Sequence, residues 1–248
     1  MPFLALSGFL SRFADFDLQG FLMTILVLSV SLSFHELAHG WVAYKLGDDT
    51  ASLQGRLTLN PLAHLDPIGS LVFIVSSLNF GRGIGWAKPV PINPARFDRK
   101  ITMKKGIMLT SLAGPTANLL LATGSAILLY LVLTAGLLAK NPESQVVTIF
   151  LRLFERMYFA NITLAVFNLL PVPPLDGYKV FGAILPNRIY YSLMQIERYI
   201  GLVFLVLVML GGSILSTIIS VVAWPFNQVI LTPINWIFNQ LWQAVGLV

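Results

Sequence analysis

Residues 21–46 read FLMTILVLSVSLSFHELAHGWVAYKL, and this stretch decides how the rest of the chain must be arranged. Its first half is an almost uninterrupted apolar run. A helix over residues 20–46 would be about 40 Å long, which is enough to cross a bilayer. Near its end stands the pattern H-E-x-x-H. Because His35 and His39 are four positions apart, they share one helix face and can bind one metal ion together, with Glu36 at the edge of that face.

The composition indicates a membrane protein with several spans. Of the 248 residues, 56% are hydrophobic and only 11% are charged, whereas a soluble domain carries roughly 25% charged residues. The chain has no cysteine, which excludes disulfides, iron–sulfur clusters and thiolate zinc sites. The net charge of +5 comes from basic residues that flank apolar runs. Membrane topology therefore explains this charge better than nucleic-acid binding does.

The order of apolar runs and breaks predicts an all-α polytopic membrane protein that forms a single domain over residues 1–248. We expect a helical bundle of about four spanning helices with a re-entrant helix, a short membrane-associated extended or β segment, and interfacial helices. The catalytic core would cover residues 20–190. The expected segments are an interfacial segment over 1–19, spanning helices over 20–46, 107–138, 146–170 and 192–223, a strand over 53–59, a re-entrant helix over 68–78, an extended segment over 81–94 and an interfacial aromatic tail over 224–248.

Prolines shape two of these expectations. Residues 81–94 contain three prolines and three glycines, which oppose a helix and favour an extended edge segment. In the tail, Pro225 and Pro233 interrupt the apolar sequence. We therefore expect the tail to be an interfacial helix with an aromatic belt, not a further span.

The basic residues predict the orientation in the membrane. Arg12, Lys140, Arg152 and Arg156 would lie on one side of the bundle, and the other lysines and arginines would lie on the opposite side. The more basic side faces the cytoplasm in most membrane proteins. We therefore expect a multi-pass protein of the cell membrane whose active site lies toward the cytoplasmic side.

A third metal ligand is needed, because a catalytic zinc site uses three protein ligands and keeps the fourth position for water. Asp176 is the acid that follows a proline-broken apolar segment and precedes Gly177. We therefore predict Zn²⁺ bound by His35, His39 and Asp176, with Glu36 as the general base for the attacking water. Ionisable groups in hydrocarbon are costly and are functional candidates by default. The alternative for Asp176 is a helix cap or an interfacial acid.

Two asparagines on other predicted spanning helices are further candidates for the site. Asn118 and Asn168 could each donate a hydrogen bond to the oxyanion of a tetrahedral intermediate. The rival role for both is interhelical hydrogen bonding. For His64, a loop histidine satisfied by the backbone is a better explanation than a metal ligand.

The extended segment supplies candidate substrate-binding residues, namely Pro89, Val90, Pro91 and Ile92. A transmembrane substrate must unwind before cleavage, and its extended backbone could pair with this segment by strand addition. The alternative is that the prolines only shape a loop.

Taken together, these motifs resemble the signatures of the site-2 protease family, the intramembrane zinc metalloproteases. The resemblance covers roughly residues 20–190 and implies zinc ligation by His35, His39 and Asp176, with Glu36 as the base. It is closest to small bacterial and archaeal members without PDZ or CBS domains. The motifs that carry it are His35-Glu36-Leu37-Ala38-His39, Asn60-Pro61-Leu62-Ala63-His64-Leu65-Asp66-Pro67-Ile68-Gly69-Ser70, Gly114-Pro115-Thr116-Ala117-Asn118 and Asn168-Leu169-Leu170-Pro171-Val172-Pro173-Pro174-Leu175-Asp176-Gly177.

The sequence thus predicts a zinc metalloendopeptidase that hydrolyses peptide bonds in or near transmembrane segments, as in regulated intramembrane proteolysis. Its partners would be single-span membrane protein substrates and the lipid bilayer. A membrane transporter or channel with an intramembrane metal site is the alternative, because broken helices and buried His and Asp residues occur there too. A catalytically silent member that only binds membrane proteins is a second rival, against which the intact Glu36 argues.

Overall fold

The computed structural model describes residues 17–80, 83, 85–186, 188–190, 199–200, 203 and 212–247. This part of the chain is helical, which confirms the predicted all-α class. In order, the elements are α2 (Leu18–Lys45), α3 (Thr50–Leu53), the 3-10 turn η1 (Pro61–Ala63), α4 (Pro67–Phe80), the 3-10 turn η2 (Pro94–Arg96), α5 (Met103–Leu138), α6 (Gln145–Asn168), α7 (Asp176–Ile184) and α9 (Gly212–Ala244). Residues 1–16 of the predicted interfacial segment over 1–19 and most of residues 191–211 lie outside the described residues, and α2 already begins at Leu18.

Helix α2 follows from its caps and its apolar sequence. The Asp17 side chain accepts the Gly20 N–H at 2.8 Å and so caps the first turn. The helix ends at Lys45, and Gly47 follows with a φ of +103°, a left-handed conformation that favours glycine. The predicted helix over residues 20–46 therefore agrees with the observed one to within two residues.

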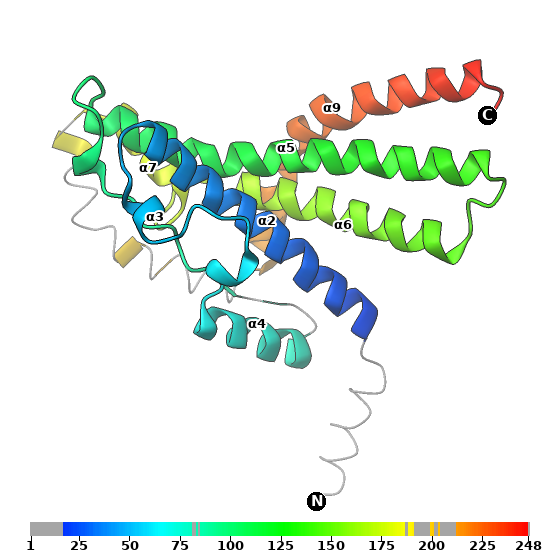
Figure 1. Cartoon of the computed structure of the whole chain (residues 1–248), viewed down its shortest axis with the longest axis horizontal. Coiled ribbons are helices and arrows are strands. Elements are labelled where there is room, and N and C mark those ends of the chain that lie inside the picture. The colour runs from blue at the N-terminus through cyan, green and yellow to red at the C-terminus, as the bar shows by residue number, and fades with distance from the viewer. Residues whose placement is uncertain are drawn as a thin grey trace, which may run out of the picture.

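The longest helices form the body of the bundle, in which α5 and α6 lie side by side as an antiparallel hairpin (Figure 1). Helix α9 packs on both of them, and its buried Ile234, Phe238 and Trp242 share one apolar core with residues of α5 and α6. A hydrogen bond also joins α9 to α5, because the Trp242 Nε1–H donates to the Thr134 hydroxyl at 2.8 Å. This core lies along one part of the hairpin and leaves another part of α5 and α6 to contact α2.

Three helices of the described residues are long and apolar enough to cross a membrane, namely α2, α5 and residues Leu215–Ala244 of α9. The sequence predicts about four. Helix α6 is not among the three, and its first half carries Arg152, Glu155 and Arg156. The fourth predicted span, residues 192–223, lies mostly outside the described residues.

Helix α9 corrects the predicted boundary between residues 223 and 224. It continues from Gly212 to Ala244 through Pro225 and Pro233, so the aromatic tail is not a separate interfacial element. A proline costs an internal hydrogen bond, but packing of apolar side chains such as Ala223, Ile234 and Phe238 against α5 and α6 stabilises the helix before and after the two prolines.

The predicted strand over residues 53–59 is also wrong. The short helix α3 ends at Leu53, and residues 54–59 form a turn and irregular chain. Gly55 then reverses the chain with a φ of +65°. Within the described residues, strand-like pairing is limited to one antiparallel bridge between Leu65 and Ala87. The residues expected to form the re-entrant helix, 68–78, are helical and belong to α4.

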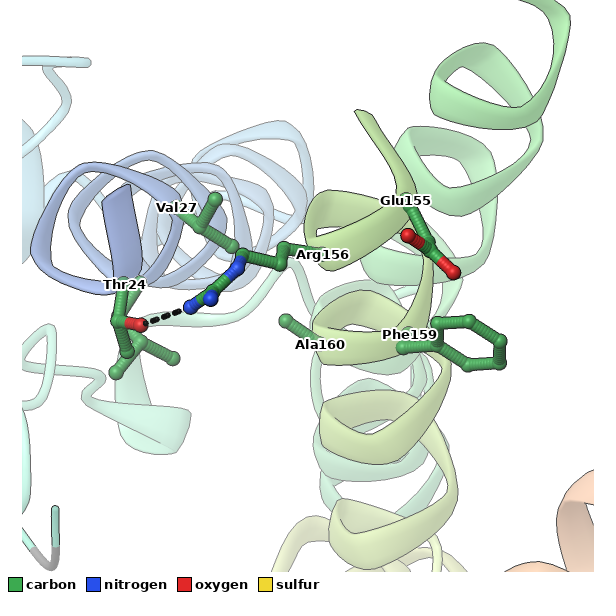
Figure 2. Close-up of a pocket in the computed structure, with 7 residues that line it drawn as sticks. Thr24, Val27, Glu155, Arg156, Phe159 and Ala160 are labelled. Atoms are coloured by element: carbon green, nitrogen blue, oxygen red, sulfur yellow. Dashed lines mark hydrogen bonds between the residues drawn. The ribbon is translucent and has the colours of Figure 1, made fainter. Parts of the chain in front are cut away.

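A basic side chain joins α6 to the first turns of α2. Arg156 reaches across an apolar hollow of about 260 Å³ and donates to the Gly20 carbonyl and the Thr24 hydroxyl, each at 3.1 Å (Figure 2). The contact fixes α2 against α6 about three turns before the H-E-x-x-H motif.

Candidate metal centre

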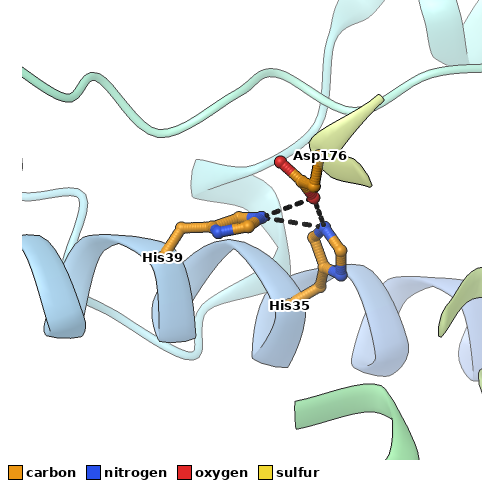
Figure 3. A group of neighbouring side chains, drawn as sticks. All are labelled: His35, His39 and Asp176. Atoms are coloured by element: carbon orange, nitrogen blue, oxygen red, sulfur yellow. Dashed lines mark hydrogen bonds and ion pairs between the residues drawn. The ribbon is translucent and has the colours of Figure 1, made fainter. Parts of the chain in front are cut away.

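Three predicted ligands meet at one point of the bundle. His35, His39 and Asp176 each offer one ligand atom, and these atoms lie within 4.8 Å of one another (Figure 3). The Asp176 Oδ2 lies 3.3 Å from the His35 Nε2 and 3.0 Å from the His39 Nε2. All three side chains are buried. Spacing on α2 brings the two histidines together, whereas Asp176 comes from the first residue of α7.

The turn before α7 places Asp176. Residues 169–175 follow the end of α6 and include three prolines, which prevent α6 from continuing. The chain then packs very closely, because a Cβ on Gly177 would lie 2.2 Å from the Leu169 carbonyl oxygen. Only glycine fits this approach, so the Asp-Gly pair delivers the carboxylate to α2.

Hydrogen bonds to the other imidazole nitrogens orient the two histidines. The His35 Nδ1 lies 2.6 Å from the Asn118 Oδ1, and the His39 Nδ1 lies 2.6 Å from the Thr110 carbonyl oxygen. Both partners are acceptors, so each Nδ1 carries the proton. Each Nε2 then presents a lone pair toward Asp176. Such outer partners commonly fix the tautomer and direction of metal-binding histidines.

Asn118 belongs to a buried network that joins three helices. It is 0% exposed, and its amide group donates to the Asn161 Oδ1 at 2.7 Å and to the Ser31 carbonyl at 3.3 Å. Asn161 in turn donates to the Ser31 hydroxyl at 2.9 Å. Both amide hydrogens of Asn118 are therefore engaged, which disagrees with its predicted role as an oxyanion donor. The sequence signal for Asn161 is an asparagine within an apolar helix, but its role was not predicted.

Gly114 explains why the first residue of the Gly114-Pro115-Thr116-Ala117-Asn118 motif is small. A Cβ at this position would lie 2.4 Å from the His39 Nε2 and 2.6 Å from the His35 Cε1. The α5 backbone thus forms one wall of the centre. Any side chain at this position would occupy the space beside the metal ligands.

We expect Gly114→Ala to lower zinc affinity by about 10- to 100-fold, the range typical of disturbed ligand orientation. Gly124→Ala is the matched control, because no atom lies within 4 Å of a Cβ built at Gly124 on the same helix. Zinc content after dialysis against a weak chelator measures the difference. Equal zinc retention by the two variants would show that α5 does not wall the site as described.

Glu36 contacts the extended segment. Its Oε2 accepts the Val90 N–H at 2.8 Å, so the predicted substrate-binding residues Pro89, Val90, Pro91 and Ile92 lie beside the predicted base. One oxygen of the Glu36 carboxylate therefore has a fixed hydrogen-bond donor.

Asn168 and His64 each form a hydrogen bond with a backbone carbonyl a few residues earlier in the chain. The Asn168 amide donates to the Leu164 carbonyl at 2.9 Å within its own helix. His64 is buried, and its Nε2 lies 2.8 Å from the Thr58 carbonyl oxygen. It is not part of the group of potential ligands found in the described residues. This arrangement agrees with the expected loop histidine.

The donor set fits zinc. Two neutral imidazoles and one carboxylate are a ligand set used by catalytic zinc, which keeps a further position open. The lone pairs of these three ligands converge in a buried space and repel one another. A bound cation would offset this repulsion. A carboxylate beside two imidazole nitrogens is therefore a suitable third ligand for a cation.

Known proteins with similar sequences are named as zinc metalloproteases. "Putative zinc metalloprotease YwhC" of Bacillus subtilis is 38% identical over 236 residues, which cover 95% of this chain and 100% of the relative. "Putative zinc metalloprotease Rip2" of Mycobacterium tuberculosis H37Rv is 32% identical over 207 residues, covering 84% of this chain and 74% of the relative. The Rip2 of Mycolicibacterium smegmatis is 30% identical over 209 residues, with the same coverage of 84% and 74%.

The family comparison points the same way. The sequence model described as Peptidase family M50 matches residues 136–211, a range that includes Asn161, Asn168 and Asp176. No solved structure is significantly similar to the chain. Identity of this level over nearly the whole length of the Bacillus relative confirms the resemblance and favours a protease over a transporter. The chain therefore belongs to peptidase family M50, the site-2 protease family, and is a membrane zinc metalloprotease.

Proposed function

We propose that the protein is an intramembrane endopeptidase that hydrolyses peptide bonds in or near the transmembrane segments of single-span membrane proteins, as in regulated intramembrane proteolysis. The buried group of His35, His39 and Asp176 carries this proposal. Two of its members lie on a helix long and apolar enough to span a membrane. A hydrolytic centre there would act on peptide bonds that soluble proteases do not reach.

His35, His39 and Asp176 would hold the zinc ion. When bound, zinc lowers the pKa of a water molecule toward about 7 and polarises a carbonyl. Glu36 takes the proton of the attacking water and later delivers it to the leaving amine. The Val90 N–H holds one Glu36 oxygen, which directs the other oxygen toward the proton that it must accept.

The two asparagines take different roles in this proposal. Asn118 positions His35, since its amide oxygen bonds the His35 Nδ1 and its amide hydrogens are engaged elsewhere. Asn168 bonds the Leu164 carbonyl with one amide hydrogen, and its other amide hydrogen has no acceptor among the described residues. This hydrogen is the better candidate for the oxyanion of the tetrahedral intermediate.

A cavity beside the extended segment supports an apolar substrate. It has a volume of about 410 Å³ and lies between α2, α4 and the chain around Trp86. Leu28 and Leu32 of α2 line it, and Leu32 lies one helical turn before Glu36. Phe73 and Ile74 of α4 form the facing wall. An unwound transmembrane segment could place apolar side chains here while Pro89, Val90, Pro91 and Ile92 lie along its backbone.

The orientation also belongs to the proposal. The basic residues at the end of α2 and before α5 support a cytoplasmic position for that end of the bundle. The protein would then lie in the cell membrane with its active site toward the cytoplasm.

Cleavage of defined membrane substrates tests this function. The probe is a pool of single-span polypeptides whose apolar segments of about 20 residues carry an Asn-Gly or Gly-Pro break. We expect the detergent-solubilised protein to cleave some of these polypeptides. Cleavage should stop when a chelator removes zinc and resume when zinc is restored. Cleavage that continues at zero zinc content would contradict the proposal.

A further inference from the structure

Residues 88–93, which we call the strap, run past Glu36 and are held at both ends by buried charged side chains. At one end, the Arg56 Nη2 donates to the Lys88 carbonyl at 2.8 Å and to the Pro89 carbonyl at 3.3 Å. At the other end, the Asp48 Oδ2 accepts the Asn93 N–H at 2.6 Å. Neither charged residue belongs to the metal group.

The burial of these two charges is costly. Arg56 is 8% exposed and Asp48 is 1% exposed, and within the described residues neither forms an ion pair that balances its charge. Buried charges without counter-ions reduce stability unless hydrogen bonds compensate. Arg56 compensates with two carbonyls of the strap, and Asp48 with backbone N–H groups of Asn93 and Thr50. Both Arg56 hydrogen bonds and the bond from Asn93 to Asp48 therefore hold the strap in position.

Between these ends, one backbone N–H of the strap, that of Val90, donates to Glu36. Proline has no N–H, so in Pro89-Val90-Pro91 only Val90 can donate, and its N–H goes to the Glu36 Oε2 at 2.8 Å. The Val90 side chain is buried. A Cβ built on Gly40 would lie 3.0 Å from the Val90 Cγ1, which shows how closely the strap packs on α2. The strap is therefore fixed along its length relative to the helix that carries Glu36.

We propose that Arg56 and Asp48 are positioning residues for the hydrolytic reaction. They hold the strap so that the Val90 N–H fixes one oxygen of the Glu36 carboxylate and leaves the other for the attacking water. This inference rests on the proposed role of Glu36 as the base. It adds that the base is oriented from a segment more than 50 residues away, through two side chains that lie outside the metal group.

The same geometry limits what the strap can offer to a substrate. Pro89 and Pro91 have no N–H, and Arg56 takes the Pro89 carbonyl. The Val90 N–H is already used by Glu36. The strap is therefore better built to hold the base than to supply a full ladder for strand addition. Changes in Arg56 should consequently alter the turnover rate and not the binding of substrate.

The kinetic test compares Arg56→Gln, Arg56→Lys and Asp48→Asn with the control Arg96→Gln. Arg96 pairs with Asp49 close to the strap, and its side chain is 47% exposed. We expect Arg56→Gln and Asp48→Asn to lower kcat by about 10- to 100-fold, the cost of a misplaced catalytic group. KM and zinc content should stay within about twofold, and Arg56→Lys should recover part of kcat. A rise in KM alone, a loss of zinc, or unchanged kcat in Arg56→Gln would overturn the proposal.

Hydrogen exchange provides a second test that does not depend on activity. Val90 carries the only exchangeable amide of Pro89-Val90-Pro91, so peptides that differ by this stretch report it alone. In the zinc-loaded full chain, we expect its amide to be protected, and to lose that protection in Glu36→Ala and in Arg56→Gln. Unchanged protection in both variants would overturn the strap proposal. If the wild-type protein cleaved no substrate while the exchange results held, the proposed function would fail and the strap geometry would stand.

Discussion

Glu36→Gln is expected to reduce cleavage of a single-span substrate by at least about 10²- to 10⁴-fold, the usual contribution of a general base. Gln has nearly the shape of Glu but cannot accept the proton of the attacking water. The Val90 N–H can still bond the amide oxygen of Gln, so the strap should stay in place. His35, His39 and Asp176 are unchanged, so zinc content should remain that of the wild type. The measurement pairs initial cleavage rates with metal analysis of the same sample.

Glu155→Gln is the matched control for this change. Glu155 lies at the hollow between α2 and α6 beside Arg156, away from the metal group (Figure 2). It should cleave at close to the wild-type rate. If Glu36→Gln cleaved as fast as Glu155→Gln, Glu36 would not be the base.

Asp176→Ala is expected to lower zinc affinity by more than about 100-fold. Even outer partners of metal ligands typically account for 10- to 100-fold, and Asp176 is placed to bind directly, with its Oδ2 3.0 Å from the His39 Nε2. The two histidines that remain are a poor zinc site, and cleavage should be lost with the metal. Zinc per chain, measured against a competing chelator, gives the affinity.

Asp66→Asn serves as the control for Asp176. The Asp66 Oδ1 accepts the Gly69 N–H at 2.8 Å and caps α4, so this acid has a structural role outside the metal group. Its variant should keep full zinc content. Zinc retained at wild-type affinity in Asp176→Ala would remove Asp176 from the ligand set.

The metal ligands could be predicted because their sequence signals are local and few acids occur at membrane depth. His35 and His39 follow from helical spacing alone. Asp176 follows from a proline-broken segment that ends in Asp-Gly. The structure brings all three together. The long helices could also be predicted from the sequence, because apolar runs with capping residues define their ends.

The role of Asn118 could not be derived from sequence, because it depends on which way a side-chain amide points. The prediction placed it at the oxyanion. In the structure its amide group donates to Asn161, which is 43 residues away, and to the Ser31 carbonyl, while its oxygen bonds the His35 Nδ1. The interhelical alternative was therefore nearer to the observed geometry.

Tertiary contacts also decided the elements that were predicted wrongly. Prolines 225 and 233 argued for a break, but the aromatic core with α5 and α6 keeps α9 helical. Alternation over residues 53–59 suggested a strand, whereas α3 ends at Leu53 and the chain turns at Gly55 with a positive φ. The hydrogen bond from the Val90 N–H to the Glu36 carboxylate joins residues 54 positions apart. No local sequence pattern predicts it.

The most direct measurement reconstitutes the zinc-loaded protein in liposomes with a single-span substrate in H₂¹⁸O and identifies the products by mass spectrometry. Hydrolysis in the membrane predicts a new carboxyl terminus inside the apolar segment, carrying one ¹⁸O atom, which Glu36→Gln does not produce. New termini found only in water-exposed parts of the substrate remote from the apolar segment, or formed equally by Glu36→Gln, would contradict the assignment of an intramembrane protease that uses His35, His39, Asp176 and Glu36.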